Sequence, residues 1–141
     1  MTTPLNVASP NDVVAQSGSP SKKALWAGRI VSAIPVLMLL MSAGMKLAKP
    51  DFVVKGTIES GFPEKLIVPL GIVELACALI YLFPRTAVLG AILVTGYLGG
   101  ATATHVRLGQ PFIIPVLLGV LAWLGVFLRE PRLRALIPLR R

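Results

Sequence analysis

A single acidic residue interrupts one of the most apolar stretches of this chain. Between residues 66 and 83 the only charged side chain is Glu74, which follows the start of the stretch by roughly 12 Å of helix. Inside a membrane a carboxyl group costs roughly 2.5 to 3.5 kcal/mol on insertion scales and by default indicates a functional site. The alternative is a protonated or hydrogen-bonded glutamate that only fixes neighbouring helices. The sequence leaves both interpretations open.

Two further side chains can reach the same depth. If the apolar segment 86–104 runs back in the opposite direction, Tyr97 lies level with Glu74 and its hydroxyl can hydrogen-bond to the carboxyl. Lys46 lies near the end of an earlier apolar segment, and its long stem can reach down toward Glu74. Lysines at helix ends more often extend outward to the lipid headgroups, and this arrangement is the one we expect for Lys46.

His105 is the single histidine of the chain and Cys77 the single cysteine. An imidazole can exchange protons near neutral pH, which suits a quinone site or a water-filled mouth. The simpler interpretation of His105 is an interfacial residue that caps helix carbonyls, and we prefer it. One histidine and one cysteine exclude a zinc site, an iron–sulfur cluster or a bis-histidine haem within one copy. We therefore expect no metal and no resident cofactor; the candidate bound molecules are a quinone or a lipid.

The composition indicates what kind of protein must position these side chains. The chain is 55% hydrophobic and only 14% charged, with a mean hydropathy of +0.78. A soluble domain carries about a quarter charged residues, because its surface faces water. The net charge of +8 comes from basic residues at the edges of apolar runs, without the interleaved aromatics of a nucleic-acid surface. The sequence predicts a membrane protein that does not bind nucleic acid.

Four apolar segments supply the elements, near residues 26–48, 66–83, 86–104 and 112–128. In lipid, uniformly apolar segments of this length satisfy their backbone hydrogen bonds only as helices. The predicted fold is all-α, an integral membrane four-helix bundle. In the first outer loop, Pro50 and Asp51 favour a helix start and Gly61 a stop. This predicts a short interfacial helix with Phe52, Val54 and Ile58 toward the membrane.

The polar ends of the chain define its organisation. We expect a disordered N-terminal tail at 1–24, the bundle at 25–129 and a basic C-terminal tail at 130–141. The side with both termini and the Pro84 turn has nine of the 14 basic residues: Lys22, Lys23, Arg29, Arg85, Arg129, Arg132, Arg134, Arg140 and Arg141. This bias predicts that both termini are cytoplasmic, in a multi-pass protein of the cell membrane, with a bacterial inner membrane the expected one. Trp26, Tyr81 and Trp123 fall toward the same side, as an aromatic belt would.

Small residues recur every four positions in the third segment. Membrane helices associate through close backbone contact, so such rows usually mark the face that meets another helix. The residues we expect at helix contacts are Gly44, Thr95, Gly96, Gly99 and Gly100. A nucleotide-binding turn is not indicated, because no phosphate-binding loop follows these glycines.

Several short motifs, in this order, resemble the DoxX-like family of small four-helix membrane proteins. They are SAGMKL at 42–47, GIVELA at 71–76, FPRTAVLGA at 83–91, GYLGGATATHVR at 96–107, and a late tryptophan before a basic tail. The resemblance implies that Gly44, Lys46, Glu74 and His105 are the positions to compare. Some relatives are named as membrane subunits of thiosulfate–quinone oxidoreductases or of redox-stress complexes, which implies a quinone-linked role and a protein partner.

Three function hypotheses follow. The first is a membrane subunit of a redox or quinone-linked complex, with Glu74 or His105 handling protons. The second is a structural or assembly subunit without chemistry of its own, and the third a small transporter or channel. A single mid-membrane charge and the lack of a duplicated broken-helix pair argue against the third. Expected partners are membrane lipids and either a protein partner or further copies of the chain; the sequence does not decide whether the chain is an enzyme.

Overall fold

The structure, a computed structural model, describes residues 21–131 and residue 133. Residues 1–20 of the predicted N-terminal tail and most of the predicted C-terminal tail lie outside this part of the chain. The elements are α2 (Lys22–Ala48), α3 (Asp51–Glu59), the short 3-10 helix η1 (Glu64–Leu66), α4 (Ile67–Leu82), the 3-10 helix η2 (Pro84–Thr86), α5 (Ala87–Arg107) and α6 (Ile113–Arg129). The described chain is thus helical, as the apolar segments predict.

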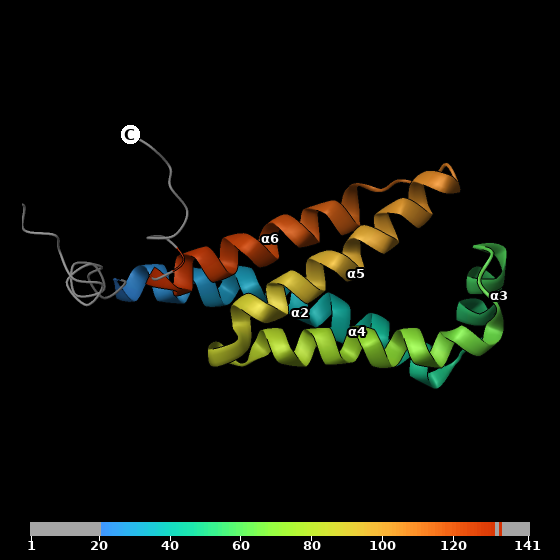
Figure 1. The fold of residues 1–141 in the computed structure, drawn as a ribbon, viewed down its shortest axis with the longest axis horizontal. Helices are drawn as coiled ribbons and strands as arrows, with labels where there is room; N and C mark the ends of the chain where they lie inside the picture. The colour runs from blue at the N-terminus through green and yellow to red at the C-terminus, as the bar shows by residue number, and fades with distance from the viewer. Residues whose placement is uncertain (1–20, 132, 134–141) are drawn as a thin grey trace, which may run out of the picture.

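Four of these helices form the bundle. Helix α2 packs against α4 and α6, and α5 packs against the same two, so that each helix has two neighbours (Figure 1). The direct turn through η2 makes α4 and α5 an antiparallel hairpin, with the Thr86 hydroxyl donating a 2.7 Å hydrogen bond to the Ile80 carbonyl. Helix α3 lies apart, across the end of the bundle where α2 ends and α4 begins.

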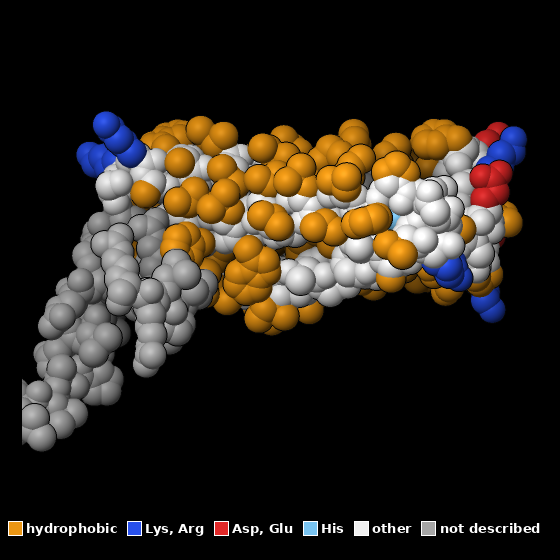
Figure 2. All heavy atoms as spheres, turned by 90° about the horizontal axis from the view of Figure 1, so that it is seen from above, with side chains coloured by type: hydrophobic (Ala, Val, Ile, Leu, Met, Phe, Trp, Pro, Cys, Tyr) orange, Lys and Arg blue, Asp and Glu red, His pale blue; other side chains and the backbone are white. Residues whose placement is uncertain are grey.

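The outer surface of the bundle is apolar along its length. Figure 2 shows hydrophobic side chains over the middle of one face and the charged side chains of the described residues gathered at the two ends. Three segments are long and apolar enough to cross a membrane: Lys22–Ala48, Glu64–Leu82 and Pro84–Arg107. Helix α6 is apolar but has 17 residues, or roughly 26 Å of helix. The fold class is confirmed as an all-α membrane helical bundle.

The predicted short helix in the first loop is present as α3. Helix α2 ends at Ala48, and the next residue, Lys49, adopts the left-handed conformation with φ 51° and donates its backbone N–H to the Met45 carbonyl. Pro50 precedes Asp51, the first residue of α3, and Gly61, with φ 80°, follows its end. Lys49 Nζ also pairs with Glu64 at 2.7 Å, which links the two ends of this loop.

The predicted packing role of four glycines is wrong for contacts within one copy of the chain. A Cβ atom added at Gly44, Gly96, Gly99 or Gly100 would meet nothing within 4 Å outside its own stretch of helix. Thr95 is exposed but does contact α6, because Trp123 Nε1 donates a 2.8 Å hydrogen bond to its hydroxyl. Gly96, Gly99 and Gly100 therefore make no close helix contact within one copy, whereas Ala87 and Ala91, earlier small residues of α5 at four-residue spacing, are buried.

The reason is that α4 and α5 diverge toward the end covered by α3 (Figure 1). Close contact is confined to the other half of the hairpin, where a Cβ at Gly90 would lie 2.3 Å from the Tyr81 Cα atom. A second tight crossing joins α6 to α2, where a Cβ at Gly125 would lie 2.1 Å from the Ser32 hydroxyl oxygen. Spacing alone did not separate these two glycines from the open ones.

Tyr81 is a buried core residue and not part of an aromatic belt, which corrects the prediction. Its side chain is 1% exposed, whereas Trp26 is 63% exposed. The Tyr81 hydroxyl donates a 2.8 Å hydrogen bond to the Ala122 carbonyl and lies 3.0 Å from the Ser32 hydroxyl. Because a buried phenol needs a partner, this contact fixes α4 against α2 and α6 at one depth.

Candidate functional site

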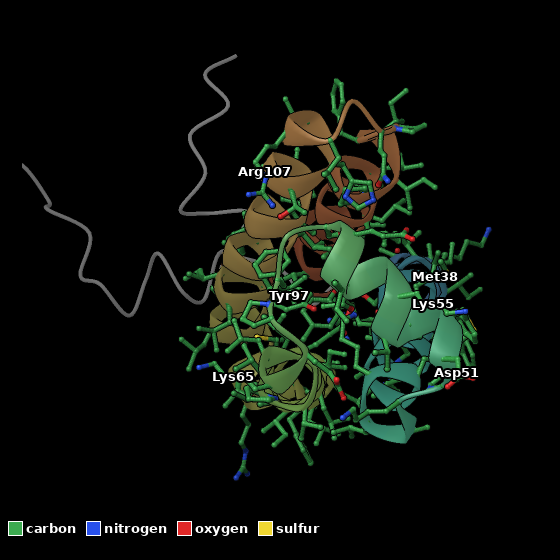
Figure 3. The ribbon with its side chains drawn as sticks, turned by 90° about the vertical axis from the view of Figure 1, so that its right-hand side faces the viewer. Met38, Asp51, Lys55, Lys65, Tyr97 and Arg107 are labelled. Atoms are coloured by element: carbon green, nitrogen blue, oxygen red, sulfur yellow. The ribbon has the colours of Figure 1, made fainter. Side chains whose placement is uncertain are left out.

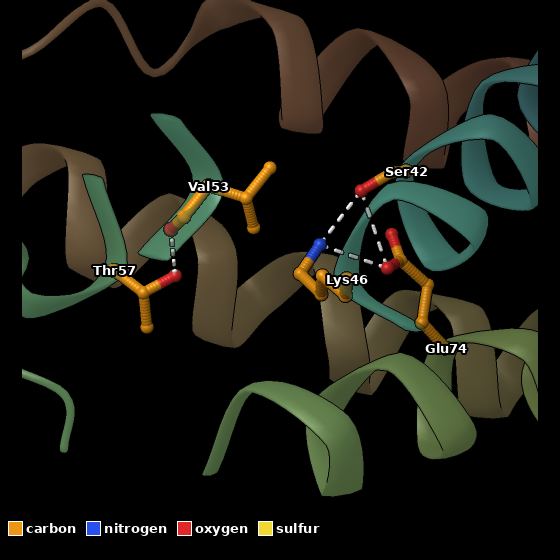
Figure 4. Close-up of polar contacts among 5 residues, drawn as sticks. All are labelled: Ser42, Lys46, Val53, Thr57 and Glu74. Atoms are coloured by element: carbon orange, nitrogen blue, oxygen red, sulfur yellow. Dashed lines mark hydrogen bonds and ion pairs between the residues drawn. The ribbon is translucent and has the colours of Figure 1, made fainter. Parts of the chain in front are cut away.

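The buried carboxyl group of Glu74 lies against α2. Glu74 is 2% exposed, and its Oε2 atom lies 2.9 Å from Lys46 Nζ. The Ser42 hydroxyl donates a 3.2 Å hydrogen bond to the same oxygen and accepts a 2.7 Å bond from Lys46 Nζ. Figure 4 shows the three side chains in one triangle. We call Ser42, Lys46 and Glu74 the polar triad.

Lys46 points inward, which corrects the expectation that it extends to the headgroups. Ser42 and Lys46 are one helical turn apart and so share the face of α2 that meets α4. Gly71 on α4 makes room there, because a Cβ at that position would come within 2.9 Å of the Lys46 Cβ. If Lys46 extended to the headgroups, the Glu74 carboxylate would stay buried without an opposite charge, which is strongly unfavourable.

Ser42 is the site residue that sequence reasoning missed. It stands first in the SAGMKL motif, and its spacing of four from Lys46 was the available signal. A serine inside an apolar helix usually bonds to the carbonyl one turn earlier, so its type alone did not indicate a site. What gives Ser42 its role is the position of Glu74 on α4, a residue 32 positions further along.

Tyr97 approaches the triad from α5. Its half-buried side chain lies near Glu74, at the depth predicted by counting along the antiparallel helices. Figure 3, which looks onto the end of the bundle where α3 lies, shows Tyr97 between α5 and the other helices. Three helices therefore contribute polar groups to one point inside the bundle.

A cavity of about 510 Å³ lies where α4 and α5 diverge. We call it the outer cavity. Lys46, Tyr97 and His105 line it together with the inner face of α3, and the remaining lining residues are Val53, Gly56, Thr57, Ser60, Phe62, Leu70, Gly96, Gly100, Ala101 and Thr104. Of the four predicted site residues, three border this space, and Glu74 is joined to it through Lys46.

His105 has one ring nitrogen engaged. Its Nδ1 atom lies 2.8 Å from the Ala101 carbonyl oxygen, so Nδ1 carries the proton in this contact. In the neutral ring this tautomer leaves Nε2 as a hydrogen-bond acceptor. The contact is a helix-carbonyl cap, as the simpler interpretation expects, and the same ring also borders the outer cavity.

Helix α3 covers the outer cavity, and Arg107 attaches it to α5. Its guanidinium donates a hydrogen bond to the Ser60 carbonyl just after α3 and lies 5.9 Å from the centre of the Phe62 ring. Phe52 and Ile58 are exposed, as the interfacial helix predicts, while Val53 and Thr57 face inward. The inward face of α3 was not foreseen from the sequence.

One protein family is similar to this chain over most of its length. No curated protein and no solved structure matches the chain. The profile of the DoxX-like family matches residues 30–125, which covers all of α4 and α5 and most of α2 and α6. The matched part includes SAGMKL, with Ser42 and Lys46, and GIVELA, with Glu74. The chain therefore belongs to the DoxX-like family.

Proposed function

We propose that this chain is a membrane subunit of a redox, quinone-linked complex, and that the outer cavity takes the head ring of the quinone. One observation carries the proposal: a buried Glu74–Lys46 ion pair borders a cavity of about 510 Å³ that is lined largely by small and apolar residues. Small-molecule sites typically have about 300 to 1,000 Å³ and a few convergent polar groups on apolar walls.

The polar groups have the chemistry that a quinone needs. Reduction of a quinone takes up electrons and protons together, so its carbonyl oxygens need hydrogen-bond donors and a nearby source of protons. The Tyr97 hydroxyl and the Lys46 ammonium can donate to such an oxygen, and Glu74 can hold a proton behind them. The electrons come from a partner subunit in this proposal, because one cysteine and one histidine cannot bind a redox centre within one copy.

Two glycines of α5 give a matched test. Gly100 lines the outer cavity and Gly99 does not, and a Cβ added at either meets nothing within 4 Å. Gly100→Leu should fill the cavity and weaken binding of a short-chain ubiquinone analogue to the purified chain in lipid nanodiscs by about tenfold, or about 1.4 kcal/mol. Gly99→Leu should bind as the wild type does. Equal binding by both variants would overturn the proposal.

The second candidate is a structural or assembly subunit, favoured by one specific observation. The Glu74 carboxylate already has an ion pair and a serine hydrogen bond, and so needs no ligand. Glu74→Gln separates the two functions. An amide keeps most of the hydrogen bonds but cannot titrate, so a folded variant that assembles but has lost quinone-dependent activity supports the first candidate. Unchanged activity supports the second.

The partners and the location belong to the same proposal. We infer a bacterial inner membrane protein with both termini in the cytoplasm, in contact with lipids and with a protein partner or further copies of itself. The apolar surface in Figure 2 supports contact with lipid. Purification in mild detergent, with identification of the proteins and quinones that stay bound, tests the partner; a lone chain without quinone would contradict it.

A further inference from the structure

A second polar feature lies at the opposite end of the bundle, where α2 begins and α6 ends. The Nε and Nη2 atoms of Arg129 are buried and have no hydrogen-bond partner within the described residues. The guanidinium stands 5.2 Å from the centre of the Tyr81 ring, which stabilises the cation only in part. A buried charged donor without a partner is strongly unfavourable, so this group is prepared for an anion.

A small cavity of about 120 Å³ adjoins this guanidinium. We call it the inner-end cavity. Its lining contains the two cationic side chains Arg29, from α2, and Arg129, from α6, against the single carboxylate of Glu130. Glu130 does not satisfy the two buried nitrogens of Arg129. The lining residues thus carry a net positive charge around a space of the size of a small oxyanion.

The start of α5 adds to this positive field. Ala87, the first residue of α5, lines the cavity. Thr86 makes no side-chain capping bond to α5, since its hydroxyl donates to the Ile80 carbonyl. The 3-10 helix η2 leads directly into α5, and its first residue, Pro84, also lines the cavity. The helix dipole makes this N-terminal end favourable for an anion.

We propose that the inner-end cavity binds the phosphate group of an anionic phospholipid. Guanidinium groups bind phosphate through paired N–H donors, and two of them from different helices can hold one group. The neighbouring surface suits a lipid: Leu25 lines the cavity, and Trp26, under the Arg29 guanidinium at 5.8 Å, is 63% exposed. Free inorganic phosphate has the same chemistry and is distinguished below.

Gly28 positions Arg129 for this role. A Cβ at Gly28 would lie 2.6 Å from the Arg129 Cγ, so only glycine lets the arginine stem run against α2. Gly28→Ala keeps every charge and displaces the stem. If the lipid phosphate is held by the position of the Arg129 guanidinium, its affinity should fall in this variant. If only net charge attracts the lipid, its affinity should stay the same.

The experiment uses the full chain in a neutral detergent. Phosphatidylglycerol is titrated and the bound lipid is counted by native mass spectrometry, with phosphatidylcholine as the lipid without net charge. We expect Arg129→Gln and Arg29→Gln each to weaken phosphatidylglycerol binding by about tenfold or more, the effect of losing one charged hydrogen-bond donor. The matched control is Arg85→Gln, which removes the same charge from an exposed position at the same end of the bundle. It should change binding less than about twofold.

Each outcome decides the proposal. Equal losses in Arg85→Gln and Arg129→Gln would show that net charge alone attracts the lipid and would overturn the proposal. No loss in Arg129→Gln would show that Arg129 does not bind the lipid, and would overturn it as well. Binding of inorganic phosphate by a wild-type chain that binds phosphatidylglycerol no better than phosphatidylcholine would keep the phosphate site but overturn the lipid as its occupant. If circular dichroism shows that Arg129→Gln is unfolded, the exposed Arg29 carries the comparison, because its substitution disturbs no core contact.

Discussion

At the scale of single residues, the most consequential feature is the buried Glu74 carboxylate and the two side chains that compensate its charge. Glu74 is stable within the bundle because Lys46 reaches it at 2.9 Å and Ser42 binds both groups. A paired buried charge costs little more than an apolar pair, but a single one is strongly unfavourable. The polar triad therefore fixes α2 against α4 whether or not it also handles protons.

Removal of one partner should destabilise the bundle more than removal of both. Lys46→Met leaves the Glu74 carboxylate uncompensated and should cost about 3 kcal/mol or more, whereas Lys46→Met combined with Glu74→Leu should recover most of that loss. The measurement is reversible unfolding in detergent, followed by helical circular dichroism. If the double variant is as unstable as the sum of the single ones, the two side chains do not form a pair.

At the scale of elements, the two halves of the α4–α5 hairpin differ in how closely the helices pack. Near η2 the helices touch, with Gly90 against the backbone of Tyr81; farther on they diverge and leave the outer cavity. Helix α3 covers that opening and is attached to α5 through Arg107. Tight contact at one end thus provides a rigid support for a space at the other.

Gly90→Ala should disrupt the tight half of this hairpin. The new Cβ would lie 2.3 Å from the Tyr81 Cα, so one backbone must shift, and we expect a loss of about 1 to 3 kcal/mol of stability. Gly99→Ala is the control on the same helix, where open space allows a gain of about 0.5 to 1 kcal/mol from helix propensity. Equal unfolding midpoints for the two variants would contradict the packing described above.

Arg107→Gln should make helix α3, which covers the outer cavity, less stable without unfolding the bundle. Loss of the bond to the Ser60 carbonyl should raise amide hydrogen exchange in α3 by roughly fivefold, which corresponds to about 1 kcal/mol. Helices α4 and α6 should exchange as before. Lys55→Gln, at an exposed position of α3, controls for the lost charge. If exchange in α3 is the same in both variants, Arg107 does not hold the cover.

At the scale of the whole molecule, the two ends of the bundle differ in kind. One end has the outer cavity under α3, and the other has the inner-end cavity between Arg29 and Arg129. The end with the start of α2 also has the larger share of basic residues in the sequence. Such a bias favours the cytoplasmic side, where anionic lipid headgroups are concentrated.

Both termini should therefore lie in the cytoplasm. A green fluorescent protein fused after Arg141 should fluoresce, and alkaline phosphatase fused at the same point should be inactive, because the phosphatase needs the oxidising outer compartment. The matching fusion in the loop after α5, at Gly109, should give the opposite result. An active phosphatase after Arg141 would reverse the orientation of the whole bundle.

Much of this architecture could be read from the sequence, because it depends on local properties. The helical segments follow from apolar length, and α3 from Pro50 and Gly61 at its borders. The depth of Tyr97 followed from counting along antiparallel helices. Predictions from local pattern were wrong where packing between helices decided the position of a side chain. Tyr81 is of a residue type that is common in aromatic belts, but it is 1% exposed and lies in the core. It can be buried there because Ser32 and Ala122 provide hydrogen-bond partners for its hydroxyl.

By itself, then, the sequence determined that the chain is a membrane-embedded helical bundle of the DoxX-like type with a carboxyl group inside it. Lipid imposes these features segment by segment, since each apolar stretch must satisfy its own backbone. Only the tertiary structure decided that Lys46 turns inward to Glu74, that Gly90 and not Gly99 makes the close contact, and that a cavity separates α4 from α5. These depend on how each helix is rotated and tilted against the others, which is set by side chains from distant segments packing together.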